Sequence, residues 1–131
     1  MPRHFTPEQA NAALAEVRPL AERLVGHRRA LAAAQARRTA LAVEIAGNGV
    51  GRDARELAEL DDRVASELAG VARCVNAIHE LGAIVKDPDA GLVDFPARLD
   101  GQEVFLCWQL GEDDVAFWHG LDDGFAGRRP L

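Results

Sequence analysis

The spacing of apolar residues changes near Gly82, and this change limits the possible folds more than any other feature of the sequence. Before Gly82, apolar residues recur at steps of three and four, which is the spacing of one face of a helix. After it they alternate, and turn-forming residues interrupt them about every eight to ten residues. The sequence therefore predicts an α+β fold, with helices first and an antiparallel sheet after them.

The first helix is expected to begin at Thr6, whose hydroxyl can accept from the backbone of Gln9 while Pro7 occupies the first helical position. Pro19 lies inside the pattern and predicts a kink or a break near Val17 and Arg18, because proline lacks an N–H and crowds the preceding turn. The apolar seam continues in phase beyond it, through Ala10, Ala13, Val17, Leu20, Leu24, Leu31, Ala34, Leu41 and Ile45.

Three glycines between residues 47 and 51 end this helix, and Asp53 is the expected cap of the next one. A second seam then runs to a stop at Gly82. It contains Leu57, Leu60, Val64, Leu68, Val71, Val75, Ile78 and Leu81. Residues 1–82 are therefore expected to form an antiparallel, coiled-coil-like hairpin with its tip near 47–52, and residues 83–131 a β-meander and tail of the same domain.

Four segments after Gly82 are expected to be strands and to form a three- to four-stranded antiparallel meander. They are Ala83–Lys86, Leu92–Phe95, Glu103–Leu110 and Val115–His119. Pro96 has no N–H to donate, so the second strand should end there or lie at an edge. The last two strands are apolar on both faces. One face is expected to pack on the helices, and the other to need the C-terminal tail, Phe125 or a second subunit. This need predicts a homo-oligomer, most simply a two-fold dimer.

The net charge of −6 argues against general nucleic-acid binding, which depends on arginine and lysine neutralising phosphates. A basic band on the first helix consists of Arg28, Arg29, Arg37 and Arg38. It could contact RNA or the acidic half of another subunit, although a solvated face is the default expectation and no aromatic residues that could stack on RNA bases accompany it. His27 and Arg38 fall at core positions of the seam, where polar residues commonly fix register. The alternative is that both face solvent beyond the partner helix.

The amino terminus lacks the apolar region of a signal peptide, and no stretch is apolar over the length of a membrane span. A cytoplasmic protein without membrane contact is expected. The two cysteines, Cys74 and Cys107, form no C-x-x-C pair and are expected to be reduced packing residues.

Six residues of the C-terminal part are candidates for binding a ligand or a partner: Asp94, Arg98, Trp108, Trp118, His119 and Arg128. The tryptophans can line a pocket, His119 can exchange a proton, and an arginine can clamp an anion. Each also has a structural explanation, since tryptophans in strands usually belong to the core and Asp94 can pair with Arg98 or Arg128. No catalytic residue is assigned.

Metal ligands could be drawn from Cys107, His119, Asp94 and His79, but no two of them have the sequence spacing of a metal motif. No metal or other cofactor is predicted. Cys107 and His119 can still approach each other across neighbouring strands, as a thiol nucleophile and its base would, although no third residue to orient them is evident.

Several segments together resemble a prokaryotic family known as domain of unknown function 2203, and the resemblance covers essentially the whole chain. The segments are residues 5–11, 17–20, 91–98, 104–112, 117–119 and 124–131. Asp94, Arg98, Trp108, Glu112, Trp118, His119 and Arg128 coincide with the family's motif residues. The resemblance implies a small bacterial protein and brings no activity, substrate or cofactor with it.

The sustained seams and the lack of a complete catalytic set favour a non-catalytic interaction or scaffold protein that self-associates and meets a protein partner. The alternative is a small-molecule binder or an enzyme for an anionic ligand that uses the Trp, His and Arg residues of the β part.

Overall fold

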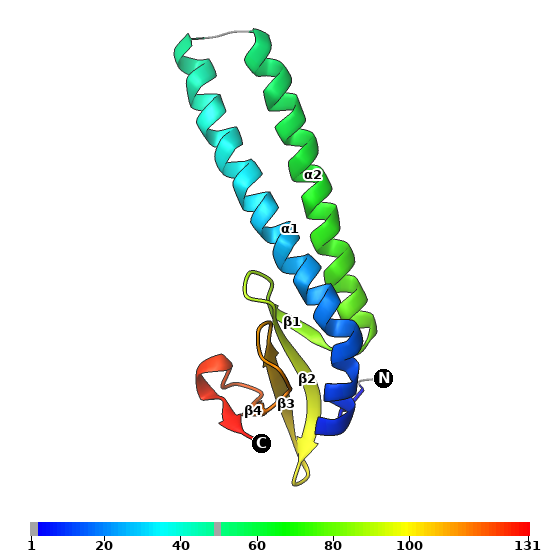
Figure 1. Cartoon of the computed structure of the whole chain (residues 1–131). Helices are drawn as coiled ribbons and strands as arrows, with labels where there is room; N and C mark the ends of the chain where they lie inside the picture. Colours follow the sequence, from blue (N-terminus) through cyan, green and yellow to red (C-terminus); the bar gives the residue numbers. More distant parts are fainter. Residues whose placement is uncertain (1–2, 49–50) are drawn as a thin grey trace.

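The computed structural model describes residues 3–48 and 51–131 and has an α+β architecture (Figure 1). Two long helices come first, followed by an antiparallel sheet of five strands. The elements are α1 (Pro7–Asn48), α2 (Gly51–Glu80), β1 (Ile84–Asp87), β2 (Leu92–Leu99), β3 (Gln102–Gln109), β4 (Phe117–Gly120), the 3₁₀ turn η1 (Phe125–Gly127) and β5 (Arg129–Pro130). The change from helix to sheet follows Gly82, whose φ of 96° ends α2 in the left-handed region.

Helix α1 begins with the predicted capping box. The Gln9 N–H donates to the Thr6 hydroxyl at 3.1 Å, and the Thr6 N–H donates to the Gln9 side chain at 3.0 Å. The helix continues through Pro19 without a break. Its first turns are tilted relative to the rest in Figure 1. The proline is thus associated with a bend of the helix, and the predicted break is not present.

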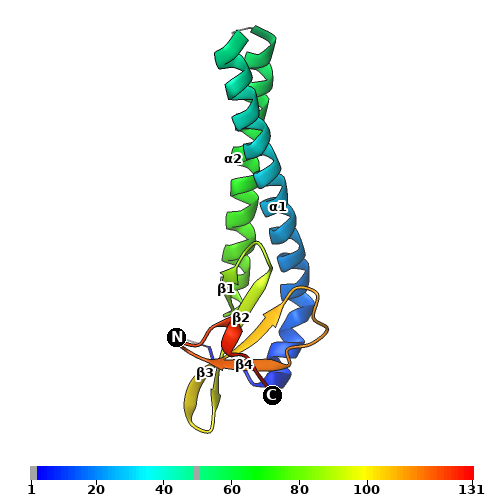
Figure 2. The ribbon, with the colours of Figure 1, turned by 90° about the vertical axis from the view of Figure 1, so that its left-hand side faces the viewer.

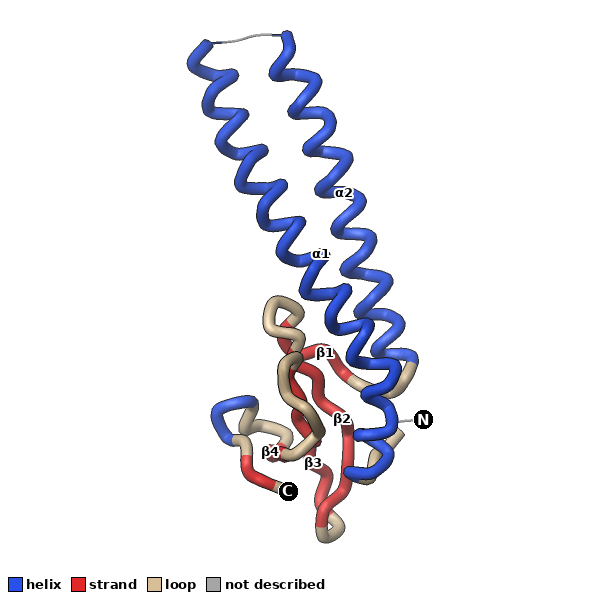
Figure 3. Tube along the Cα trace, in the orientation of Figure 1, coloured by secondary structure: helices blue, strands red, loops and turns tan. Residues whose placement is uncertain are grey.

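The helices lie side by side as an antiparallel hairpin that extends well beyond the sheet (Figures 1 and 3). The predicted tip falls between Asn48 and Gly51, where residues 49 and 50 lie outside the described part. Helix α2 begins two residues before Asp53, so that side chain belongs to the first turn and is not the cap. Leu68, assigned to the seam from its spacing, is instead 48% exposed.

The strands follow one another in the order β1-β2-β3-β4-β5, as a meander does. Strand β2 is longer than expected and passes through Pro96. Strand β1 pairs only with residues 92–94 of β2, so Pro96 lies beyond it at a local edge, where its carbonyl accepts from the Phe5 N–H at 2.7 Å. The tail adds the fifth, two-residue strand by pairing Arg129 with Trp118.

The sheet has two differently covered faces. Its inner face packs on both helices through a core that includes Phe95, Leu106 and Trp108. Figure 1 shows the C-terminal tail on the opposite side of the sheet from α1, and Figure 2 shows it in front of the strands. The tail and its Phe125, two of the covers that the sequence allowed, therefore lie on the outer face.

Candidate functional site

Three chemically reactive side chains meet on the outer face of the sheet. Asp94 in β2 lies directly opposite Cys107 in β3, and His119 in β4 is one diagonal step away. All three are buried, with exposures of 1%, 0% and 3%. One ligand-type atom of each, a carboxylate oxygen, the sulfur and a ring nitrogen, lies within 4.8 Å of the other two. The sequence allowed Cys107 to approach His119 and offered Asp94 with both as possible metal ligands, but none of these residues has the spacing of a metal motif, so their meeting was not predicted.

His119 is held from both sides of its ring. Nδ1 lies 2.7 Å from the Gly120 carbonyl oxygen, and Nε2 lies 3.0 Å from Oδ2 of Asp94. Oδ1 of Asp94 is buried and has no hydrogen-bond partner within residues 3–48 and 51–131. The partner of Asp94 is therefore His119, and not Arg98 or Arg128 as its position in an apolar strand led us to expect.

Burial raises the pKa of the Cys107 thiol to about 12, and the neighbouring negative charge of Asp94 acts in the same direction. The thiol is therefore protonated at neutral pH. A thiolate nucleophile activated by His119 is disfavoured in this arrangement, because activation requires a lowered thiol pKa.

Asp94 and His119 also line a pocket of about 220 Å³. Lys86 and Leu92 stand on the strand side, and the chain after β4 closes the rest with Leu121, Asp122, Gly124 and Phe125. The buried pair therefore borders a cavity that is formed by the sheet and the tail together.

Arg128 lies beside the cluster and serves a structural purpose. Its guanidinium donates to both carboxylate oxygens of Glu112 at 2.8 Å and packs on the rings of Phe117 and Phe125 at 4.1 and 4.5 Å. The Glu112 carboxylate also accepts from the Gln109 N–H at 2.7 Å. Arg128 thus holds the tail against the sheet through Glu112, while its Nε is buried and has no hydrogen-bond partner among the described residues.

The remaining predicted residues do not join the cluster. Trp108 is fully buried on the inner face and donates from its indole N–H to the Glu112 carbonyl at 3.0 Å. Trp118 pairs with Leu106 and therefore faces the same side of the sheet as Trp108, opposite to His119. Arg98 is exposed on β2. The set of tryptophan, histidine and arginine residues is thus divided between two faces.

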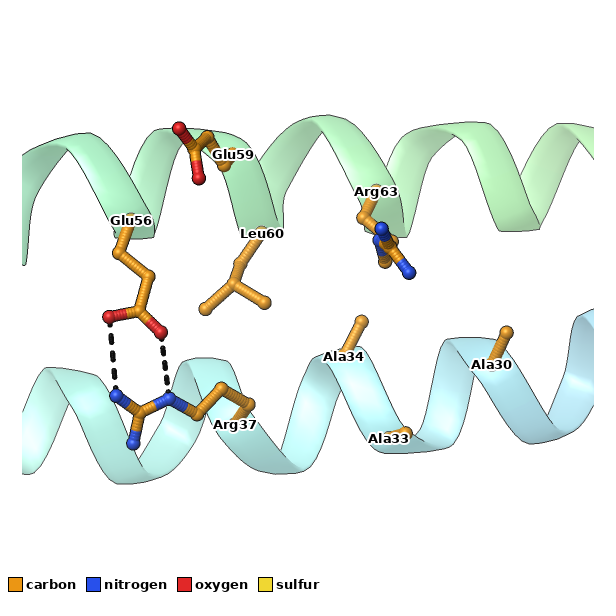
Figure 4. Close-up of a pocket in the computed structure, with 8 residues that line it drawn as sticks. All are labelled: Ala30, Ala33, Ala34, Arg37, Glu56, Glu59, Leu60 and Arg63. Carbon is orange, nitrogen blue, oxygen red and sulfur yellow. Dashed lines mark hydrogen bonds and ion pairs between the residues drawn. The ribbon is translucent and has the colours of Figure 1, made fainter.

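A second hollow, of about 370 Å³, lies between the helices and far from the cluster (Figure 4). It is lined by Ala30, Ala33, Ala34, Arg37, Glu56, Glu59, Leu60 and Arg63. Arg37 donates to Glu56 at 2.8 Å across one end of the hollow, as the dashed lines in Figure 4 show.

The basic band of α1 is largely neutralised within the chain. Arg28 pairs with Asp89 of the β1–β2 turn, Arg37 with Glu56, and Arg38 with Asp61. These acids occupy the guanidinium groups that a phosphate backbone would need. The band therefore adds no support for nucleic-acid binding.

The fold and the cluster define a class of α+β protein. In this class a helical hairpin packs on the inner face of an antiparallel meander, and a buried Asp, Cys and His lie on the outer face. The family model described as "Uncharacterized conserved protein (DUF2203)" matches residues 3–131. The chain therefore belongs to that family, as its resemblance led us to expect. Neither the curated proteins nor the solved structures provide a match. Among the helices of the described residues, none is both long enough and apolar enough to cross a bilayer.

Proposed function

We propose that this chain is a non-catalytic interaction protein that self-associates as a dimer through the part of the hairpin that projects beyond the sheet. The observation that carries the proposal is the hollow between the helices in Figure 4, which is floored by alanines and Leu60. The role would be exercised in the cytoplasm, in keeping with the sequence expectation.

Incomplete burial supports this proposal. Between residues 53 and 73, α2 contributes no fully buried apolar side chain, and Leu57, Leu60 and Val64 are only half-buried. Two helices alone leave one side of their shared seam open to water. A second hairpin laid on that side would complete a four-helix arrangement and bury more apolar surface.

The edges of the hollow suit a second copy of the same chain. Small alanine side chains let helices approach closely. Glu59 and Arg63 have charges of opposite sign. A two-fold axis can therefore place Glu59 of each copy beside Arg63 of the other.

The proposal is tested by measuring the molar mass in solution by sedimentation equilibrium. We expect the wild-type chain to have the mass of two chains and the Ala33→Glu variant, which places a carboxylate in the hollow, to have the mass of one. Ala32→Glu is the matched control, because Ala32 is exposed on the same helix and does not line the hollow. A monomeric wild type at high concentration, or equal dissociation by both variants, would contradict the proposal.

A small-molecule binder remains the second candidate, favoured by the pocket beside Asp94 and His119. Fewer of the candidate residues can contact a ligand than the sequence suggested, because Trp108 faces the helices and Arg128 pairs with Glu112. Lys86 is the cation that lines this pocket and could meet an anionic ligand.

This second candidate predicts that inorganic phosphate, used as a probe, shifts the NMR signals of Lys86 and His119 at millimolar concentration. The Lys86→Gln variant should lose the shifts, whereas Arg98→Gln should keep them. Unchanged spectra of the wild-type chain would remove anion binding from consideration.

A further inference from the structure

We propose that Asp94, Cys107 and His119 form a binding site for a zinc-type transition-metal ion on the outer face of the sheet. This inference goes beyond the proposed self-association and does not depend on it. It rests on the mixed set of ligand atoms, on their distances and on a buried carboxylate oxygen that lacks a partner.

The hydrogen bonds of His119 determine where its proton lies. Nδ1 is 2.7 Å from a backbone carbonyl, which can only accept, so Nδ1 carries the hydrogen. In a neutral ring Nε2 then presents a lone pair, and it lies 3.0 Å from Oδ2 of Asp94, which is also an acceptor when ionised. Two acceptors at this distance need a proton or a metal ion between them.

A proton on Nε2 answers that need only in part. It would join Nε2 to Oδ2 in an ion pair, but it would leave Oδ1 of Asp94 without a partner in a fully buried position. A buried carboxylate oxygen without a hydrogen bond is costly, and buried charges in proteins are usually paired or bound to a metal. A divalent cation would serve the carboxylate, the imidazole and the sulfur of Cys107 at once.

The three ligand types select the ion. A thiolate, an imidazole and a carboxylate together suit zinc or a metal of similar chemistry, whereas calcium and magnesium prefer oxygen alone. Ligand atoms on tetrahedral zinc lie about 3 to 4 Å apart, given bonds of about 2.0–2.3 Å. The present separations, all within 4.8 Å, need only small side-chain adjustments.

The surroundings have two further features of a metal site. The Nδ1–H bond to the Gly120 carbonyl is the outer contact that usually orients a ligating histidine. The pocket beside Asp94 and His119 leaves room for a fourth ligand such as water. Binding would form three metal–ligand bonds and release two protons to solvent, the thiol proton of Cys107 and the proton held between Nε2 of His119 and Oδ2 of Asp94.

Cobalt(II) is a suitable probe because a thiolate ligand gives it a sulfur-to-metal charge-transfer absorption in the near ultraviolet. The purified full chain, stripped with chelator and titrated with Co²⁺, is expected to develop this band at one equivalent and to lose it when Zn²⁺ is added. Equilibrium dialysis with Zn²⁺ gives the stoichiometry independently.

The chain supplies its own matched control, since Cys74 is also buried and free but lies in the core on α2. Cys107→Ala should abolish the charge-transfer band and weaken Zn²⁺ binding by more than about 100-fold, which exceeds the usual effect of losing an outer contact. Cys74→Ala should keep both properties. Circular dichroism establishes that each variant is folded.

Two results would overturn the site. One is a folded wild-type chain that takes up no stoichiometric Zn²⁺ or Co²⁺, which does not depend on any variant. The other is a charge-transfer band that survives in Cys107→Ala. Neither result depends on the molar mass of the chain in solution. The proposals of a metal site and of self-association can therefore be rejected independently.

Discussion

Asp94 and His119 form a buried polar pair in which each side chain stabilises the other. Each loses its hydration on burial, and the loss is offset only when the two remain together. Their positions on adjacent strands and the carbonyl of Gly120 keep the ring in one orientation. The contribution of either side chain therefore depends on the presence of the other.

Truncating Asp94 should reveal this dependence. We expect Asp94→Ala to lower the free energy of unfolding by about 3 kcal/mol, because it leaves Nε2 of His119 buried without a partner. Asp94→Asn should cost much less, since an amide N–H can donate to Nε2. Urea denaturation with chelator present measures both changes. Asp122→Ala, at an exposed residue of the same pocket, is the control. An equal loss of unfolding free energy in Asp94→Ala and Asp94→Asn would contradict this explanation.

Arg28 and Asp89 allow a prediction about protonation. Two hydrogen bonds from Arg28 are the main cause of the lowered pKa of Asp89, and the arginine's charge adds to it. A lowered carboxyl pKa contributes stability above the ordinary pKa, and this contribution is lost as the pH falls through the folded value. The contribution is small here because the pair is exposed.

In Arg28→Gln, the pKa of Asp89 should rise to its ordinary range when followed by NMR titration of the side-chain carboxyl. Arg29→Gln, on the next residue, should leave the titration unchanged. A lowered pKa that persists in Arg28→Gln would show that another group causes it.

The hairpin is held in register by polar contacts across its seam. His27 lies 2.8 Å from Glu67, and Arg38 pairs with Asp61. Gly70 belongs to the same contact, because a Cβ built at this position would lie 2.5 Å from the His27 ring. The polar residues that interrupt the predicted seam therefore face the partner helix, and a glycine makes room for one of them.

Two glycine substitutions separate helix propensity from packing. Alanine favours helix over glycine by about 1 kcal/mol, so Gly26→Ala, which meets nothing within 4 Å, should stabilise the protein by up to that amount. Gly70→Ala should destabilise it, because the new methyl group displaces His27 from Glu67. Thermal unfolding of the two variants provides the comparison. If both variants were more stable than the wild type, the contact between His27 and Glu67 would contribute nothing to the free energy of unfolding.

The whole molecule consists of a sheet between two unlike covers. The helices cover the inner face, and the tail covers the outer face through Phe125 and Arg128. The pocket beside Asp94 exists only because the tail closes it. Loss of the tail contacts is therefore expected to expose apolar strand surface and to open the candidate site.

Arg128→Ala should lower the free energy of unfolding by about 2 kcal/mol and increase the binding of a hydrophobic dye, because it removes the pair with Glu112 and the packing on Phe117. Arg129→Ala is the matched control, as Arg129 is exposed and stacks on Trp118. Both properties are measured on the same samples. Equal effects of the two substitutions would contradict the role given to Arg128.

The sequence by itself determined the elements of this protein. The step of the apolar residues, the capping box at Thr6 and the left-handed glycine at 82 act between near neighbours, so hairpin and meander could be predicted from them. One signal was local but ambiguous. Pro96 was compatible with either the end or the edge of a strand, and the length of β1 decided between them.

Only the tertiary structure decided the composition of the candidate site. Asp94, Cys107 and His119 come from three strands, and their meeting depends on strand register and on which face each residue takes. Register shifts by one residue reverse the faces, and no local pattern fixes them to that accuracy. Trp118 and His119, by contrast, lie on opposite sides of the sheet because successive side chains alternate along any strand. The pairing of Arg128 with Glu112 instead of Asp94 is again a tertiary contact.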